Sequence, residues 1–114
     1  MSRILINDGS KRPLLGAVVL AESTRARMKG LLGRSSLPAG TGMLLRPCGS
    51  IHMWFMRFPI DAAFLDRDMR VLKVARHLKP WQLGFAPRGT ACVLETAAGE
   101  LAAVEPGTEL AIAD

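Results

Sequence analysis

Short apolar runs recur along the chain, and glycine, proline or small polar residues separate them. Runs of this length with this punctuation are typical of β-strands. The pattern predicts roughly seven or eight short strands, at residues 3–7, 14–21, 43–47, 50–58, 60–66, 70–76, 91–97 and 109–113. The runs 60–66 and 70–76, joined by the polar turn "DRDM", predict a hairpin. Residues 78–89 are interrupted by prolines and glycines, and we predict irregular structure there.

The hydrophobic period changes between residues 24 and 32. Met28, Leu31 and Leu32 are spaced three and four residues apart, which places them on one face of a helix. Serine and threonine just ahead of this run are suitable N-cap residues. We therefore predict one short helix around residues 24–32. Together, the predicted strands and this helix indicate a mainly-β, single-domain barrel or sandwich over residues 1–114.

Four motifs follow one another in a fixed order along the chain. They are "RARMKGLLGR", "LPAGTGMLL", "HMWFMRFPIDAAFLDRDMRV" and "VLETAAG". With these motifs the chain resembles the domain of unknown function 192 (DUF192) family, from about residue 15 to the C-terminus. The resemblance implies a compact mainly-β fold with one short helix, and it implies no established activity. Leu32 stands where the family pattern has a methionine. The residues ahead of Met53 also differ from the pattern, so no role for His52 is carried over.

The net charge of +5 is unevenly distributed along the sequence. Residues 1–60 hold nine Lys/Arg and two acidic residues, whereas residues 61–114 hold six Lys/Arg and eight acidic residues. The basic first half can attract a phosphate, a carboxylate or a nucleic acid, or it can simply be a solvated surface. Because aromatic residues make up only 5% and tyrosine is absent, we expect no specific nucleic-acid recognition. Weak electrostatic binding to nucleic acid, or a regulatory role, remains an alternative.

The two cysteines, Cys48 and Cys92, lack the spacing of a zinc site. We interpret them as reduced thiols in a cytoplasmic protein, the alternative being one disulfide in an exported protein. Many members of the family carry an export signal, but their compartment is not carried over to this chain. The apolar run at residues 14–21 is short for a signal peptide, and we predict a strand there. No apolar stretch is long enough to cross a membrane, so we expect no membrane partner.

The stretch "SIHMWFMRF" is apolar on both strand faces, which favours a buried central strand. Its histidine and methionines also suit a soft ion such as Cu(I). However, His52 and Met56 are four residues apart, about 13 Å in a strand, which is too far for one ion. We therefore expect no metal site and no cofactor.

Asp61 and Glu95 are single acids within apolar runs. A buried carboxylate must be paired, hydrogen-bonded or protonated. For Asp61 we predict a defined partner, either an arginine guanidinium or backbone N–H groups. In the structural interpretation both acids form buried ion pairs or cap backbone amides. In the functional interpretation they line a pocket with aromatic walls and orient a polar ligand.

No motif of a known catalytic class is present, and His77 is not tied by spacing to a nucleophile. A hydrolase that uses Asp61 and Glu95 remains an alternative, but we favour a non-catalytic protein and assign no catalytic residue. The preferred hypothesis is a small module that binds a polar or anionic small ligand. Its candidate residues are Arg25, Arg34, His52, Trp54, Arg57, Asp61, Trp81 and Glu95. The identity of the ligand and the oligomeric state are left open.

Overall fold

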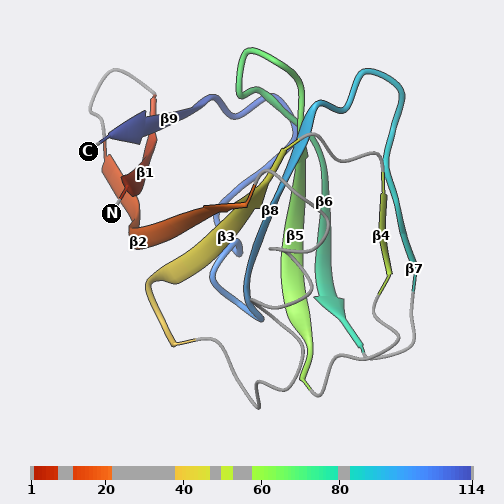
Figure 1. Ribbon diagram of the computed structural model, residues 1–114, viewed down its shortest axis with the longest axis horizontal. Coiled ribbons are helices and arrows are strands. Elements are labelled where there is room, and N and C mark those ends of the chain that lie inside the picture. The colour runs from red at the N-terminus through yellow and green to blue at the C-terminus, as the bar shows by residue number, and fades with distance from the viewer. Residues whose placement is uncertain are drawn as a thin grey trace.

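The computed structural model describes residues 2–7, 12–21, 38–46, 50–52, 58–79 and 83–113. Over these residues the chain forms strands β1 Ser2–Ile6, β2 Arg12–Ala21, β3 Thr41–Leu45, β4 Ser50–His52, β5 Ile60–Leu65, β6 Val71–Leu78, β7 Leu83–Phe85, β8 Cys92–Ala97 and β9 Leu110–Ala113 (Figure 1). The predicted mainly-β class is therefore confirmed. The helix predicted around residues 24–32 lies outside the described residues.

Seven of the strands form one sheet in the order β6-β5-β8-β3-β2-β1-β9. β2 and β3 are parallel, and the other neighbouring pairs in this sheet are antiparallel. The sheet curls into a half-barrel, so that the start of β6 approaches β9. There Val71 N–H donates to Thr108 O at 2.8 Å, and Leu110 N–H donates to Met69 O at 2.9 Å. These bonds connect the two edge strands at one end of the sheet.

A surface ion pair lies at the same junction. Arg70 Nη2 is 2.9 Å from Glu109 Oε1, and the two residues also form an isolated β-bridge. The hydrogen bond to Glu109, together with its negative charge, raises the pKa of the Arg70 guanidinium above its ordinary value. Both side chains are about half exposed, so the backbone bonds contribute more to this junction than the ion pair does.

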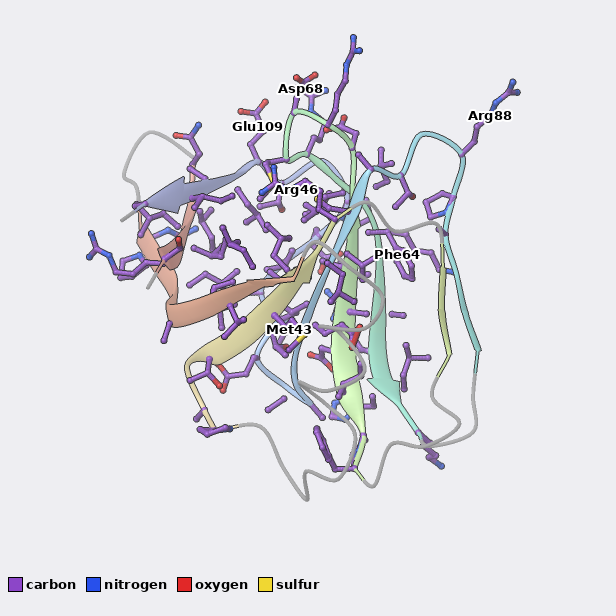
Figure 2. The ribbon with its side chains drawn as sticks, viewed as in Figure 1. Met43, Arg46, Phe64, Asp68, Arg88 and Glu109 are labelled. Carbon is purple, nitrogen blue, oxygen red and sulfur yellow. The ribbon has the colours of Figure 1, made fainter. Side chains whose placement is uncertain are left out.

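The two faces of the sheet carry separate apolar clusters. The cluster enclosed by the curled sheet draws on all seven of its strands and consists of Ile4, Ile6, Leu15, Val18, Leu44, Ala63, Leu65, Val71, Cys92, Leu94, Leu101, Val104 and Leu110. The cluster on the other face consists of Met43, Leu45, Phe58, Ile60, Ala62, Phe64 and Val93. We call them the inner cluster and the outer cluster. Figure 2 shows Met43 and Phe64 within the molecule, whereas Asp68 and Arg88 extend away from it.

The predicted hairpin is confirmed as β5 and β6, which pair antiparallel. Its turn is closed by Asp66 N–H donating to Arg70 O and Met69 N–H donating to Asp66 O. Met69 has φ of 64°, because the last residue of such a three-residue turn adopts the left-handed conformation. The positive φ of Met69 therefore follows from the turn itself.

Two predictions about the segments around this hairpin are wrong. Residues 50–52 do not form a central strand, because β4 pairs with β7 in a separate two-stranded sheet. The rest of the stretch "SIHMWFMRF" up to residue 57 lies outside the described residues. Residues 83–85, expected to be irregular, form β7. Prolines flank this short segment in the sequence, and pairing with β4 overrides that local signal.

Gly42 provides a test of the packing between β3 and β8. A Cβ at this position would lie 2.9 Å from the backbone oxygen of Glu95 and 3.0 Å from Leu15 Cδ1. We expect Gly42→Ala to lower the free energy of unfolding by about 1–3 kcal/mol, because the backbone of β8 cannot yield as a side chain would. Urea denaturation measures the difference.

The matched control is Gly16→Ala on β2, where the nearest atom to a Cβ is 3.9 Å away. This variant should be neutral or slightly stabilising, by up to about 1 kcal/mol. Equal stability of the two variants would contradict the close approach of β3 and β8.

Candidate functional site

The structure describes the side chains of two of the eight predicted site residues, Asp61 and Glu95. His52 is the last residue of β4, with its Cα paired to that of Leu83. The other five lie outside the described residues: Arg25, Arg34, Trp54, Arg57 and Trp81. Assignment of these five and of His52 to a site therefore stays a prediction.

Asp61 is completely buried, with a relative exposure of 0%. Its Oδ1 accepts a hydrogen bond from His77 N–H at 2.9 Å. Its Oδ2 accepts from Gly99 N–H at 3.0 Å and from Leu101 N–H at 3.1 Å. The prediction of a defined partner is confirmed, and that partner is a set of backbone N–H groups. These three hydrogen bonds connect the carboxylate on β5 to β6 and to the segment that follows β8.

The segment of β6 opposite Asp61 contains a β-bulge. Ile60 pairs with Leu78 and Ala62 with Ala75, so two residues of β6 lie opposite the single Asp61. The second of these two is His77, which has φ of 53°. The extra residue breaks the alternation of the strand, and Asp61 satisfies the backbone N–H that the bulge leaves without a ladder partner.

The same carboxylate also positions the chain that follows β8. Gly99, with φ of 95°, lies in the turn that follows this strand. Leu101 and Val104 follow in this segment, and both are fully buried in the inner cluster. By fixing the N–H groups at positions 99 and 101, Asp61 determines how these two side chains enter the core. The geometry therefore gives Asp61 a structural role.

Glu95 is the second buried carboxylate, with a relative exposure of 3%. It lies in β8, and its direct neighbours are Met43 on β3 and Ala62 on β5. Residues directly opposite in a sheet share a face, so Glu95 faces the outer cluster. Among the described residues, no buried side-chain nitrogen or oxygen lacks a hydrogen-bond partner. Glu95 is therefore a bonded polar group on an otherwise apolar face.

The two carboxylates lie on opposite faces of the sheet. Asp61 pairs with Thr96, and the adjacent Ala62 pairs with Glu95. Because successive residues of a strand point to opposite faces, the sheet separates the two carboxyl groups. They cannot act together on one bond of a substrate, as a hydrolase with two carboxylates requires.

The pairing of strands limits where two of the chain connections begin and end. His52 pairs with Leu83 at one end of the small sheet, and Ile60 pairs with Leu78 at one end of the β5–β6 hairpin. The connection from β4 to β5 contains Trp54 and Arg57, and the connection from β6 to β7 contains Trp81. The described strand ends that these connections join are therefore paired with one another, His52 with Leu83 and Ile60 with Leu78. Figure 1 shows β4 and β7 side by side beyond β6.

The backbone of His77 is a partner of Asp61 that the sequence did not reveal. Its side chain is exposed, although its backbone is anchored to the buried Asp61. In the sequence, His77 lies three residues before Pro80, near the end of an apolar run. A bulge depends on pairing between strands, and one strand's sequence does not show it.

Metal-binding groups are not clustered in the described part of the chain, where no three His, Cys, Asp or Glu residues come together. Cys92 is buried, and its Sγ lies 3.9 Å from Met69 Sδ. Cys48 lies outside the described residues, so the redox state of the two cysteines stays a prediction. Among the described residues, no helix has the length and apolar character needed to cross a membrane.

An open cavity of about 430 Å³ lies near the end of β1 and the start of β2. It is lined by Ile6, Asn7, Arg12, Ala103, Gly107, Thr108 and Glu109. Its lining contains none of the predicted site residues. Glu109, one of the charged residues in this lining, is already paired with Arg70.

Comparison with known proteins identifies the family. The model of the DUF192 family, described as an uncharacterized ACR, matches residues 5–112. This chain belongs to the DUF192 family. The expected resemblance is therefore confirmed, and it extends ten residues further toward the N-terminus than the motifs indicated. The family description assigns no biochemical role.

Two UPF0127 proteins are similar to this DUF192 protein. A UPF0127 protein of Thermococcus sibiricus is 30% identical over 84% of this chain, which spans 64% of that relative's length. A UPF0127 protein of Pyrococcus horikoshii is 29% identical over 90% of this chain and 91% of the relative.

Two solved structures resemble this fold, each at 25% sequence identity over 96% of the chain. One is a protein of unknown function from Novosphingobium aromaticivorans, with a TM-score of 0.81 and 83% of its own chain covered. The other, from Sinorhizobium meliloti, is described as a candidate transcription regulator, with a TM-score of 0.82 and 92% covered.

The structural role of Asp61 predicts a large loss of stability when its carboxylate is removed. Asp61→Ala leaves the N–H groups of His77, Gly99 and Leu101 without their acceptor. We expect the free energy of unfolding to fall by on the order of 3–5 kcal/mol. Urea denaturation measures the loss, and amide hydrogen exchange should show faster exchange at these three positions.

Asp68→Ala is the matched control, because Asp68 is exposed in the β5–β6 turn. Its effect should stay within about 0.5 kcal/mol. A loss of stability in Asp61→Ala no larger than that of this control would contradict the role of the carboxylate.

Proposed function

We propose that this DUF192 protein is a small binding module for a polar or anionic small ligand. The observation that supports the proposal is Glu95, a bonded carboxylate on the apolar outer face of the sheet. Burial of a carboxylate costs free energy, and an apolar side chain at this position would make folding more favourable. Ligand pockets combine apolar walls with a few well-placed polar groups, and the outer face at Glu95 has this composition.

Under this proposal Glu95 orients an arginine that contacts the ligand. A guanidinium has five N–H donors, and a carboxylate occupies two of them in a bidentate pair. The remaining donors are available for a carboxylate, phosphate or hydroxyl group of a ligand. The candidate arginines are Arg25, Arg34 and Arg57, and the candidate walls are His52, Trp54 and Trp81. Asp61 is not part of the proposed site, because its oxygens are bound to backbone N–H groups.

Binding is favoured over the alternative of a two-carboxylate hydrolase by the position of the acids. Asp61 and Glu95 lie on opposite faces of the sheet, and no other pair of acids was predicted for that chemistry. The proposal accordingly includes no catalytic residue.

A thermal-shift panel of small polar and anionic compounds, including inorganic phosphate, tests the binding module. We expect at least one compound to raise the melting temperature of the wild type in a concentration-dependent way. A ligand at one hundred times its Kd stabilises the folded protein by about 2.7 kcal/mol. Glu95→Gln should abolish this rise, measured against the variant's own melting temperature without ligand.

Glu100→Gln is the matched control, since Glu100 is partly buried and accepts a bond from Gly40 N–H at 3.2 Å. It should retain the rise that the wild type shows. The proposal is wrong if no compound stabilises the wild type, or if Glu95→Gln responds as strongly as Glu100→Gln does.

Binding to nucleic acid is a second candidate function. One observation favours it, the structural similarity to the Sinorhizobium meliloti protein described as a candidate transcription regulator. The basic first half of the sequence supplies the charge for contacts with phosphate groups. Because the composition offers few stacking residues, we expect the binding to be weak and insensitive to sequence.

Fluorescence anisotropy with two unrelated DNA duplexes tests this second candidate. The affinity should be similar for both duplexes and should fall steeply between 50 and 200 mM salt, by roughly ten-fold or more for every two or three phosphate contacts. Absence of binding at the lowest salt would exclude the candidate. A strong preference for one duplex would contradict the expected lack of specificity.

A further inference from the structure

The segment between β8 and β9, residues 98–109, packs onto the inner cluster without belonging to a strand. We call it the strap, and Figure 1 shows it in blue, running from the end of β8 to the start of β9. Within the strap the chain forms turns, in which Ala102 N–H donates to Gly99 O at 3.3 Å and Val104 N–H donates to Leu101 O at 3.0 Å. Isolated turns have little stability of their own. The strap is therefore held in place by its contacts with the rest of the fold.

The strap contributes two fully buried side chains to the inner cluster, Leu101 and Val104. The residues around Val104 are exposed, and they are Ala102, Ala103, Glu105, Pro106 and Gly107. A segment with few buried apolar contacts opens at a lower free energy than a core strand does. Residues 102–106, which we call the middle of the strap, thus depend on Val104 for their apolar contact with the core.

Both ends of the strap are tied to buried residues of the sheet. At its start, Asp61 accepts hydrogen bonds from Gly99 N–H and Leu101 N–H. Near its end, Gly107 N–H donates to Val71 O at 2.7 Å. Because Asp61 and Val71 are buried in β5 and β6, these bonds fix both ends of the strap to the sheet.

The middle of the strap is tied to the sheet by Arg76 of β6. Among the described residues, its hydrogen bonds to other segments come from Arg76 alone, whose Nη2 donates to Val104 O and lies 3.3 Å from Glu105 Oε1. The side chains of Arg76 and Glu105 are 35% and 70% exposed, so their ion pair contributes little. The bond to Val104 O is therefore the main polar contact that keeps the middle of the strap closed.

Open space borders the same part of the strap. The cavity of about 430 Å³ is lined by Ala103 and Gly107 of the strap and by Ile6 of β1. Ile6 is also a member of the inner cluster. Close-packed neighbours resist the movement of a segment, whereas a cavity does not. Displacement of the middle of the strap would connect this cavity with the inner cluster.

We propose that residues 102–106 form a gate between the cavity and the inner cluster, that Arg76 latches this gate, and that the gate opens while the sheet stays folded. On opening, Val104 leaves the inner cluster and exposes its apolar neighbours to the cavity. The gate lies on the enclosed side of the sheet, opposite Glu95. The inference is therefore independent of the proposed function.

Amide hydrogen exchange of the full chain, followed by nuclear magnetic resonance at urea concentrations below the unfolding transition, tests the gate. Movement of the gate away from the fixed Leu101 breaks the bond from Val104 N–H to Leu101 O. After correction for intrinsic rates, we expect Val104 N–H to exchange roughly ten-fold faster or more than Leu101 N–H, which Asp61 holds. The rate at Val104 should be independent of urea, whereas the rates of the β8 amides should rise with urea.

Three variants test the latch. Arg76→Met keeps the length of the side chain and removes its donors, so Val104 N–H should exchange roughly ten-fold faster or more than in the wild type. The rate at Leu101 should change by less than about two-fold. Glu105→Gln removes the ion pair and keeps the bond to Val104 O, and Arg88→Met removes an arginine that extends away from the molecule (Figure 2). Both should leave the rate at Val104 within about two-fold of the wild type.

The gate is overturned if Val104 N–H of the wild type exchanges as slowly as Leu101 N–H, or if its rate rises with urea as the rates of β8 do. The latch is overturned if Arg76→Met accelerates exchange at Val104 no more than Arg88→Met does. Equal acceleration at Val104 and Leu101 in Arg76→Met would also contradict it, because the variant would then loosen the whole strap. An effect of Glu105→Gln as large as that of Arg76→Met would overturn the role of the bond to Val104 O.

Discussion

The buried carboxylate of Asp61 is the interaction on which the arrangement of this fold depends. It accepts hydrogen bonds from three backbone N–H groups, at His77, Gly99 and Leu101. These groups lie 16, 38 and 40 residues away along the sequence. One side chain on β5 thus accepts the backbone N–H of His77 at the bulge of β6 and fixes the path of the chain after β8. That path delivers Leu101 and Val104 to the inner cluster.

The register between β5 and β8 places the two buried acids on opposite faces of the sheet. Asp61 faces the enclosed side of the curled sheet and works as a structural acceptor. Glu95 faces the outer cluster, beside Met43 and Ala62. A shift of one residue in this register would exchange the faces of every side chain on the strand. Strand pairing therefore places the structural carboxylate of Asp61 and the proposed binding carboxylate of Glu95 on opposite faces of the sheet. This placement excludes joint catalysis by the two acids.

Local features of the fold could be predicted from the sequence, and long-range features could not. Strand alternation puts Asp61 on the face of Ala63 and Leu65. Its burial in an apolar strand predicts a partner for it, and the structure confirms the partner. The identity of that partner depends on residues 38 and 40 positions away, which no local pattern encodes. The separate sheet of β4 and β7 and the bulge at His77 likewise arise from pairing between distant segments. For the same reason the sequence favoured an arginine and backbone amides equally.

The most direct test of this account is the detection of scalar couplings across the hydrogen bonds of Asp61. In a uniformly ¹³C,¹⁵N-labelled sample, the side-chain carboxyl carbon of Asp61 should correlate with three backbone amide nitrogens, those of His77, Gly99 and Leu101. The couplings between paired strands in the same spectrum serve as the internal reference. Observation of the sheet couplings without any of these three correlations would contradict the central role of Asp61.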